Sequence, residues 1–219
     1  MTALRLFPVA LALAVLTVAA VLAGASPAQG AVIINEILAD PASDWDGDGA
    51  VDARGDEWIE VLNTGPDAVD LTAYWLRDDA VTTPRLNLFG ILPAGEAAVF
   101  YGSQAVAWQE EVGQTTAGFA LNNGGDRVVL LRTVAGSDPL ALEDVDQADF
   151  TDHQAEDDRS CGWSTDRGAW RLFDALLPYT GSLEPQGTGC PPTPGLPNAC
   201  GEEVGVQATS LGSLKAAYR

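Results

Sequence analysis

The sequence predicts an all-β protein whose folded part is a sandwich or barrel. Short apolar runs recur along the chain, and glycine, proline, asparagine and aspartate separate them, which is typical of strands joined by turns. No long stretch combines a capping residue with apolar residues at positions i, i+3, i+4 and i+7, so we expect almost no helix. The 47% hydrophobic content and the six tryptophans supply material for one core. One domain followed by a tail is the expected organisation.

Residues 1–30 have the pattern of a signal peptide. Arg5 precedes an apolar run over residues 6–22, and small residues then lead to Gly30. A membrane anchor is the competing interpretation, because the apolar run approaches the length of a membrane span. The small residues at its end and the absence of a basic flank favour cleavage. We therefore expect a secreted protein or one at the extracellular surface, with no membrane span after cleavage.

Strands are expected where an apolar run is bounded by turn residues. Asn63-Thr64-Gly65-Pro66 and Asn122-Asn123-Gly124-Gly125 are clear examples of such boundaries. The expected strands lie at residues 31–39, 57–63, 74–77, 97–101 and 127–132.

The rest of the chain carries weaker strand signals. Residues 143–158 are dense in aspartate and glutamate, which predicts a solvated edge strand or an acidic loop. Residues 178–200 are rich in proline and glycine and predict an irregular strap that lies over the sandwich. Residues 201–219 form a C-terminal tail with a basic end. This tail is either a sorting or attachment signal, as in some exported bacterial proteins, or a frayed end.

Several of these segments together resemble the lamin-tail domain family. They are Val32-Ile33-Ile34-Asn35-Glu36-Ile37, residues 56–65 (DEWIEVLNTG), 69–71 (VDL), 75–78 (WLRD), 92–96 (LPAGE), 121–126 (LNNGGD) and 192–198 (PTPGLPN). The resemblance implies an immunoglobulin-like β-sandwich over residues 31–200, with an acidic loop between the first two strands. Similar domains of exported bacterial proteins are often attached to nucleases, phosphatases or adhesive modules, and look like binding or surface-attachment units. The resemblance therefore implies no catalytic activity for the domain itself.

The charge balance argues against nucleic acid as a partner. The chain has 11 lysines and arginines against 31 aspartates and glutamates, and its formal net charge is −20. Binding phosphates requires clustered basic side chains, whereas the few basic residues here are scattered among carboxylates. Cations, or a protein or glycan ligand, are the expected partners, although the charge also serves solubility alone.

The sharpest local motif is Asp44-Trp45-Asp46-Gly47-Asp48-Gly49, which is typical of a calcium loop. Carboxylates at alternate positions can surround a calcium ion when glycine allows the chain to turn tightly. The motif departs from the EF-hand, because Gly55 stands where the loop requires a bidentate glutamate and because a strand precedes it. A solvated acidic turn is the alternative. The candidate ligands, with calcium in a structural role, are Asp44, Asp46, Asp48, the Ala50 carbonyl, Asp52, Asp56 and Glu57.

No catalytic motif is visible. His153 is the single histidine, so a Ser-His-Asp triad would depend on it, and its acidic neighbourhood indicates exposure. We therefore expect no catalytic residues. The alternative is a small calcium-dependent hydrolase of phosphoesters or glycans, which would use carboxylates between Asp44 and Glu60. Such an enzyme would hold them in a concave pocket, whereas a calcium-stabilised module would present its loop on a convex surface.

Two further features concern stability. Strand alternation places Glu60 on one face with Trp58, so we expect its carboxylate to be buried and hydrogen-bonded. The three cysteines have no Cys-x-x-Cys spacing, and an exported chain meets an oxidising environment. We favour a disulfide between Cys190 and Cys200, which would close the strap, over a pairing with Cys161.

Overall fold

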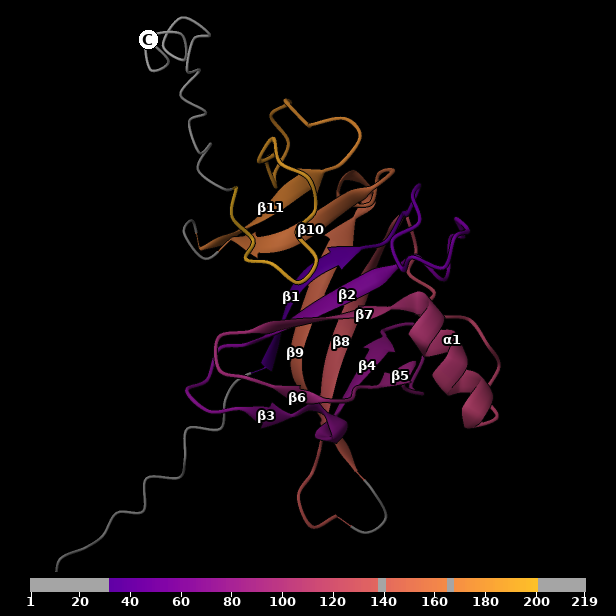
Figure 1. Cartoon of the computed structure of the whole chain (residues 1–219). Coiled ribbons are helices and arrows are strands. Elements are labelled where there is room, and N and C mark those ends of the chain that lie inside the picture. The colour runs from indigo at the N-terminus through magenta and orange to yellow at the C-terminus, as the bar shows by residue number, and fades with distance from the viewer. Residues whose placement is uncertain (1–31, 138–140, 165–167, 201–219) are drawn as a thin grey trace, which may run out of the picture.

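The computed structural model describes residues 32–137, 141–164 and 168–200 (Figure 1). The expected signal peptide at residues 1–30 and the tail at residues 201–219 lie outside the described residues. The strands are β1 (Val32–Leu38), β2 (Trp58–Asn63), β3 (Val69–Asp70), β4 (Tyr74–Asp78), β5 (Leu86–Asn87), β6 (Ile91–Leu92), β7 (Ala97–Tyr101), β8 (Gly125–Thr133), β9 (Leu142–Thr151), β10 (Arg159–Ser164) and β11 (Ala169–Asp174). The helices are α1 (Gly102–Glu111) and the short 3-10 turns η1 (Leu71–Ala73) and η2 (Asp152–Gln154).

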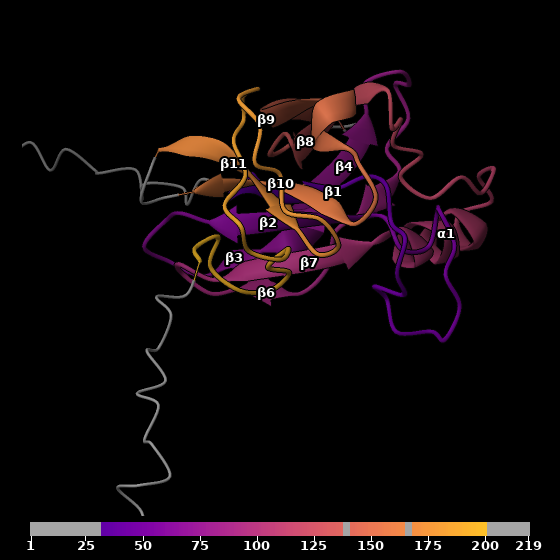
Figure 2. The same cartoon turned by 90° about the horizontal axis from the view of Figure 1, so that it is seen from above.

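The strands form two main antiparallel sheets that pack on each other. One sheet has the order β11-β10-β1-β2-β7, the other has the order β5-β4-β8-β9, and β3 pairs with β6 (Figures 1 and 2). Burying the apolar faces of both sheets produces one core. Its fully buried members include Ile34, Ile59, Leu71, Leu76, Leu86, Leu88, Phe119 and Leu130. The predicted immunoglobulin-like β-sandwich, with the acidic loop between the first two strands, is confirmed.

A bulge in β1 decides which of its residues face outward. Its pairing with β2 shifts register between Ile34 and Glu36, and Ile34 and Ile37 both join the core although they are three residues apart. An extra residue in one strand has this effect on the alternation of side chains. Asn35 and Glu36 therefore lie together on the outer side of the sheet, where their side chains bond to Glu60 and Thr193.

The helix α1 was not predicted, and the expectation of almost no helix was wrong at this point. Its buried residues are Gly102, Ala105 and Gln109, so no apolar stripe marks it in the sequence. Gln109 is fully buried and bonds to the backbone of Arg85, Ala117 and Gly118. Tertiary hydrogen bonds thus replace the apolar face by which an amphipathic helix is normally identified.

The C-terminal third completes the first sheet. β10 pairs with β1, and β11 pairs with β10 at the sheet edge. Neither strand was predicted. β9 is the edge strand of the second sheet, in agreement with the expected solvated edge. None of the described helices is long and apolar enough to cross a membrane.

The segment that follows β11 has the irregular form predicted for it. Residues 191–200 carry no strand or helix, and they lie over the first sheet in both views (Figures 1 and 2). The Cys190–Cys200 disulfide is present, with the two Cα atoms 5.8 Å apart. The remaining cysteine, Cys161, is free and buried in β10. We keep the name strap for residues 191–200, the part of the predicted segment 178–200 that lies over this sheet.

Candidate functional site

The acidic loop brings three of its carboxylates together. Asp44, Asp46 and Asp48 each place one oxygen within 4.8 Å of the others. Gly47 and Gly49 have φ angles of 77° and 92°, which side chains other than that of glycine rarely adopt. These two turns let carboxylates at alternate positions converge on one point. Hard oxygen ligands gathered in this way suit a calcium ion.

Backbone hydrogen bonds hold these carboxylates in place. Asp44 accepts from the N–H groups of Gly47 and Gly49, at 2.8 and 3.0 Å. Asp48 accepts from the N–H of Ala50 at 2.7 Å, and Asp46 accepts from that of Asp48 at 3.0 Å. Hydrogen bonds to the backbone thus fix the loop shape, and three negative charges lie close together in it.

Asp56 anchors the two ends of the loop to each other. This side chain is 1% exposed, and its Oδ1 accepts from the N–H groups of Trp45 and Asp46. Its Oδ2 accepts from the N–H of Asp52 at 2.8 Å. Both oxygens of Asp56 thus serve the backbone of the loop, and the structure does not place Asp56 in the cluster of Asp44, Asp46 and Asp48.

A second buried aspartate, which the sequence analysis did not identify, fastens the start of the loop. Asp158 lies before β10, and its carboxylate accepts from the backbone of Ala42 and Ser43, from the Ser43 hydroxyl and from the Trp45 indole. Burial raises the pKa of this carboxyl, but the hydrogen bonds from Ser43 and Trp45 outweigh it and hold the pKa below its ordinary value. No sequence signal could reveal a partner 113 residues away from Trp45.

The other candidate ligands lie elsewhere. Asp52 caps its own turn, accepting from the N–H groups of Arg54 and Gly55, and these bonds lower its pKa. Ala50 is exposed at the outer part of the loop. Glu57 precedes β2 and turns toward Ala120, beside a shallow hollow that its side chain helps to line. The structure thus brings together three of the seven predicted ligands.

Glu57 is the most strongly perturbed carboxyl of the described residues. It is 3% exposed, and burial raises its pKa to about 9, although the N–H groups of Leu121 and Ala120 donate to it. Its Oε2 is enclosed and has no hydrogen-bond partner among residues 32–137, 141–164 and 168–200. At neutral pH this group is a buried, protonated carboxylic acid.

Two more buried carboxyls lie under the strap, on the outer side of the first sheet. Glu60 accepts from Asn35 Nδ2 at 2.5 Å and from the Gly195 N–H at 2.6 Å, which confirms the expected buried, hydrogen-bonded state. Burial raises its pKa. Glu36 accepts from the Ser160 hydroxyl and from the backbone and hydroxyl of Thr193. Burial raises the pKa of Glu36 to about 7.

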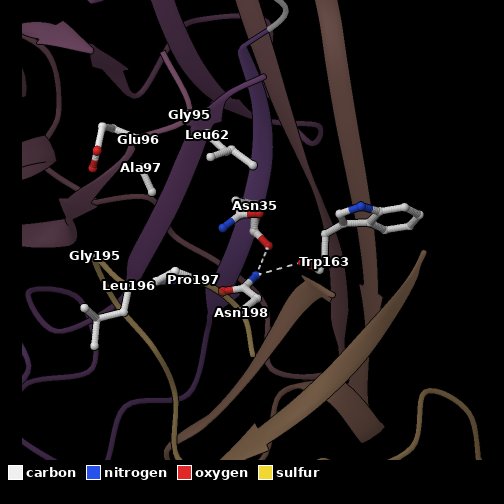
Figure 3. Close-up of a pocket in the computed structure, with 10 residues that line it drawn as sticks. All are labelled: Asn35, Leu62, Gly95, Glu96, Ala97, Trp163, Gly195, Leu196, Pro197 and Asn198. Carbon is white, nitrogen blue, oxygen red and sulfur yellow. Dashed lines mark hydrogen bonds between the residues drawn. The ribbon is translucent and has the colours of Figure 1, made fainter. Parts of the chain in front are cut away.

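A pocket of about 210 Å³ opens beside these carboxyls (Figure 3). We call it the strap pocket. It is lined by Asn35, Leu62, Gly95, Glu96, Ala97, Trp163, Gly195, Leu196, Pro197 and Asn198. Asn198 ties the strap to the sheet, since its Nδ2 donates to the carbonyl oxygens of Asn35 and Trp163 at 2.8 and 3.2 Å. The acidic loop joins the end of β1 to the start of β2, whereas Leu62, which lines the strap pocket, lies near the end of β2. The two sites are therefore separate.

His153 is not part of either site. Its Nε2 lies 3.2 Å from the Pro185 carbonyl oxygen, and its ring contacts the edge of Tyr179 with centroids 4.5 Å apart. Its backbone N–H donates to Asp152. These contacts pack the His153 side chain against Tyr179 and Pro185, in the segment that follows β11.

Comparison with known proteins identifies the family. A family model described as Lamin Tail Domain matches residues 25–152, a segment that includes β1 to β9. β10, β11 and the strap lie beyond the matched segment, although β10 pairs with β1 inside it. No curated protein and no solved structure matches. The matched residues make up more than half of the chain, and the chain therefore belongs to the lamin tail domain family.

Proposed function

We propose that this protein is an exported, non-catalytic binding or structural module that calcium stabilises outside the cytoplasm or at the cell surface. The convergence of Asp44, Asp46 and Asp48 within 4.8 Å carries the calcium part of this proposal. The sequence pattern of residues 1–30 and the Cys190–Cys200 disulfide support an extracellular location, since disulfides persist in oxidising compartments. The family supports a module rather than an enzyme.

Calcium would act by neutralising the loop. Asp44, Asp46 and Asp48 repel one another when no cation lies between them, and that repulsion opposes the folded shape. The anchoring of the loop by Asp56 and Asp158 links its order to β2 and β10. Affinity in the range of about 10⁻⁴ to 10⁻³ M is expected, because extracellular modules bind calcium in this range.

The test is a thermal melt in calcium and in chelator. We expect millimolar calcium to raise the melting temperature of the parent chain, because a ligand that binds the folded state alone stabilises it. In Asp46→Ala combined with Asp48→Ala, two of the three clustered carboxylates are gone, so calcium should have no effect on the melting temperature.

The matched control is Glu110→Ala combined with Glu111→Ala. These two carboxylates are exposed at the end of α1, so this variant loses the same charge away from the loop. Its response to calcium should equal that of the parent. A melting temperature of the parent that is the same in calcium and in chelator would refute the calcium proposal.

The alternative hydrolase function has one observation in its favour, the perturbed carboxyl of Glu57 beside a hollow. Glycan hydrolysis takes a pair of carboxyls, however, and Glu57 is the one carboxyl among the described residues that line this hollow. The acidic cluster, in turn, lies on a surface loop, where Asp44 and Asp48 are exposed and Asp46 is half-buried. The non-catalytic module is therefore the function that we propose.

A further inference from the structure

We propose that the strap pocket binds an alkylammonium group, such as the side chain of a lysine in a partner protein. This inference rests on the proposed function as a binding module and specifies the chemistry of its ligand. Three observations on the described residues carry it. They are two buried carboxyls without a cationic partner, an enclosed carbonyl oxygen without a donor, and a pocket whose lining includes a carboxylate and no basic side chain.

The first observation concerns Glu36 and Glu60. Both are 0% exposed, and among the described residues none of the ion pairs includes either of them. Within the described part of the chain, all the hydrogen-bond donors to Glu36 and Glu60 are neutral groups. Buried carboxylates are normally paired with a cation, and without one their charged form is disfavoured. Glu60 is bonded to two residues that line the pocket, Asn35 and Gly195, so a cation in the pocket would stabilise the charged form of Glu60.

The second observation concerns Asn35, which is 3% exposed and lines the pocket. Its Nδ2 donates to Glu60 at 2.5 Å, and this bond sets the orientation of the side-chain amide. The other amide atom, Oδ1, is buried and accepts no hydrogen bond from any residue that the structure describes. An unpaired buried acceptor is costly, so a ligand that donates a hydrogen bond here gains more than it would at an exposed carbonyl.

The third observation concerns the shape and lining of the pocket. Figure 3 shows Leu62 and Ala97 on one side and Leu196 and Pro197 on the other, with Asn35 between them. These apolar walls suit the methylene stem of a long side chain, which Lys buries while its charged end seeks polar groups. Glu96, which is exposed, adds a carboxylate to the lining.

The same features disfavour a sugar or a larger ligand. The volume of about 210 Å³ lies below the roughly 300–1,000 Å³ typical of sites for drug-sized molecules. The Trp163 indole points away from the other lining side chains in Figure 3, so it offers no platform on which a sugar ring could stack. A single aliphatic chain with a charged donor at its tip matches both the size and the chemistry.

The experiment is a titration of the isotope-labelled chain with Nα-acetyl-lysine methylamide, followed by nuclear magnetic resonance at about 0.15 M salt, where exposed charges are partly screened. The side-chain amide signal of Asn35 should shift. The uncharged analogue Nα-acetyl-norleucine methylamide should bind at least tenfold more weakly. Equal binding of the two compounds would overturn the proposal.

Variants then locate the binding. Glu96→Gln should weaken the binding of the lysine compound about two- to fivefold, as expected for an exposed ion pair. Leu196→Trp should abolish binding by filling the pocket, and Leu196 is 62% exposed, so the fold should tolerate it. Glu110→Gln, on α1, should bind as the parent does. Binding that none of these variants changes would be general attraction to an acidic protein and would also overturn the proposal.

A second arm identifies the source of the ammonium group. Tighter binding of the lysine compound than of 1,4-diaminobutane supports a protein lysine as the ligand, whereas the reverse supports a free amine; both outcomes retain the alkylammonium group. The variants Glu96→Gln and Leu196→Trp leave the acidic loop intact, so the calcium effect on melting should be unchanged in them. Failure of this inference is therefore distinguishable from failure of the calcium proposal.

Discussion

Replacing Glu36 with glutamine should make the protein less sensitive to alkaline pH. Burial raises the pKa of Glu36 from 4.5 to about 7, so the folded state holds this proton more tightly than the unfolded state does. The associated stability is fully present below pH 4.5 and is lost as the pH rises through 7. With 1.36 kcal/mol for each pKa unit, the loss between pH 5 and pH 8 is about 2.5 kcal/mol.

The Glu36→Gln side chain can keep the local hydrogen bonds. Glu36 Oε1 accepts from Ser160 and from the Thr193 N–H, and an amide oxygen can do the same. An amide nitrogen at the position of Oε2 would donate to Thr193 Oγ1, which lies 2.8 Å away. Thr193 Oγ1 is then free to donate to Asn198 Oδ1, at 3.0 Å. The variant therefore removes the titrating group without leaving a buried polar atom unpaired.

The assay is urea denaturation of parent and variant at pH 5 and pH 8. The free energy of unfolding of Glu36→Gln, relative to that of the parent, should rise by about 2.5 kcal/mol between the two pH values. Glu57 and Glu60 also have raised pKa values, but they are present in both proteins and cancel in the comparison. Glu110→Gln is the control and should follow the parent. Parallel pH profiles for Glu36→Gln and the parent would refute the reasoning.

Two further predictions concern the strap and the helix. Cys190→Ser combined with Cys200→Ser should lower the free energy of unfolding by about 2–4 kcal/mol, and dithiothreitol should destabilise the parent but not this variant; equal sensitivity of both to the reductant would contradict it. Gly102→Ala should lower the melting temperature, with a loss of about 1–3 kcal/mol, because the added Cβ would lie 1.7 Å from the Arg54 carbonyl oxygen. An unchanged melting curve for Gly102→Ala would mean that this contact relaxes without cost.

Local pattern was sufficient to predict most of the first part of the sandwich. The runs at residues 31–39, 57–63 and 97–101 are apolar, short and bounded by turn residues, and they became β1, β2 and β7 with boundaries shifted by at most one residue. β10 was missed because Arg159–Ser164 is polar and buries an arginine and two serines through tertiary bonds. A strand held in this way between two neighbours has no apolar alternation to detect.

The candidate site, too, was predicted only where its residues lie close together in the sequence. The motif of residues 44–49 identified the cluster of Asp44, Asp46 and Asp48, because ligands only two residues apart are placed by the local turn itself. Asp56 was predicted as a ligand by its proximity in sequence, but its oxygens bond to the backbone of the loop. Asp158 was not predicted from the sequence.

The sequence by itself determined the sandwich class, the acidic loop and the strap, because strand patterns, turn chemistry and closely spaced ligands depend on neighbours along the chain. Its motifs also carried the resemblance to the family. The tertiary structure alone decided what the buried carboxyls face. Glu36 meets Thr193 across 157 residues, and Trp45 meets Asp158 across 113. Such contacts depend on which strands pair and on where the strap lies, and burial and hydrogen bonds together then set the pKa of each carboxyl. The strap pocket exists for the same reason, since five separate segments of the chain meet to form it.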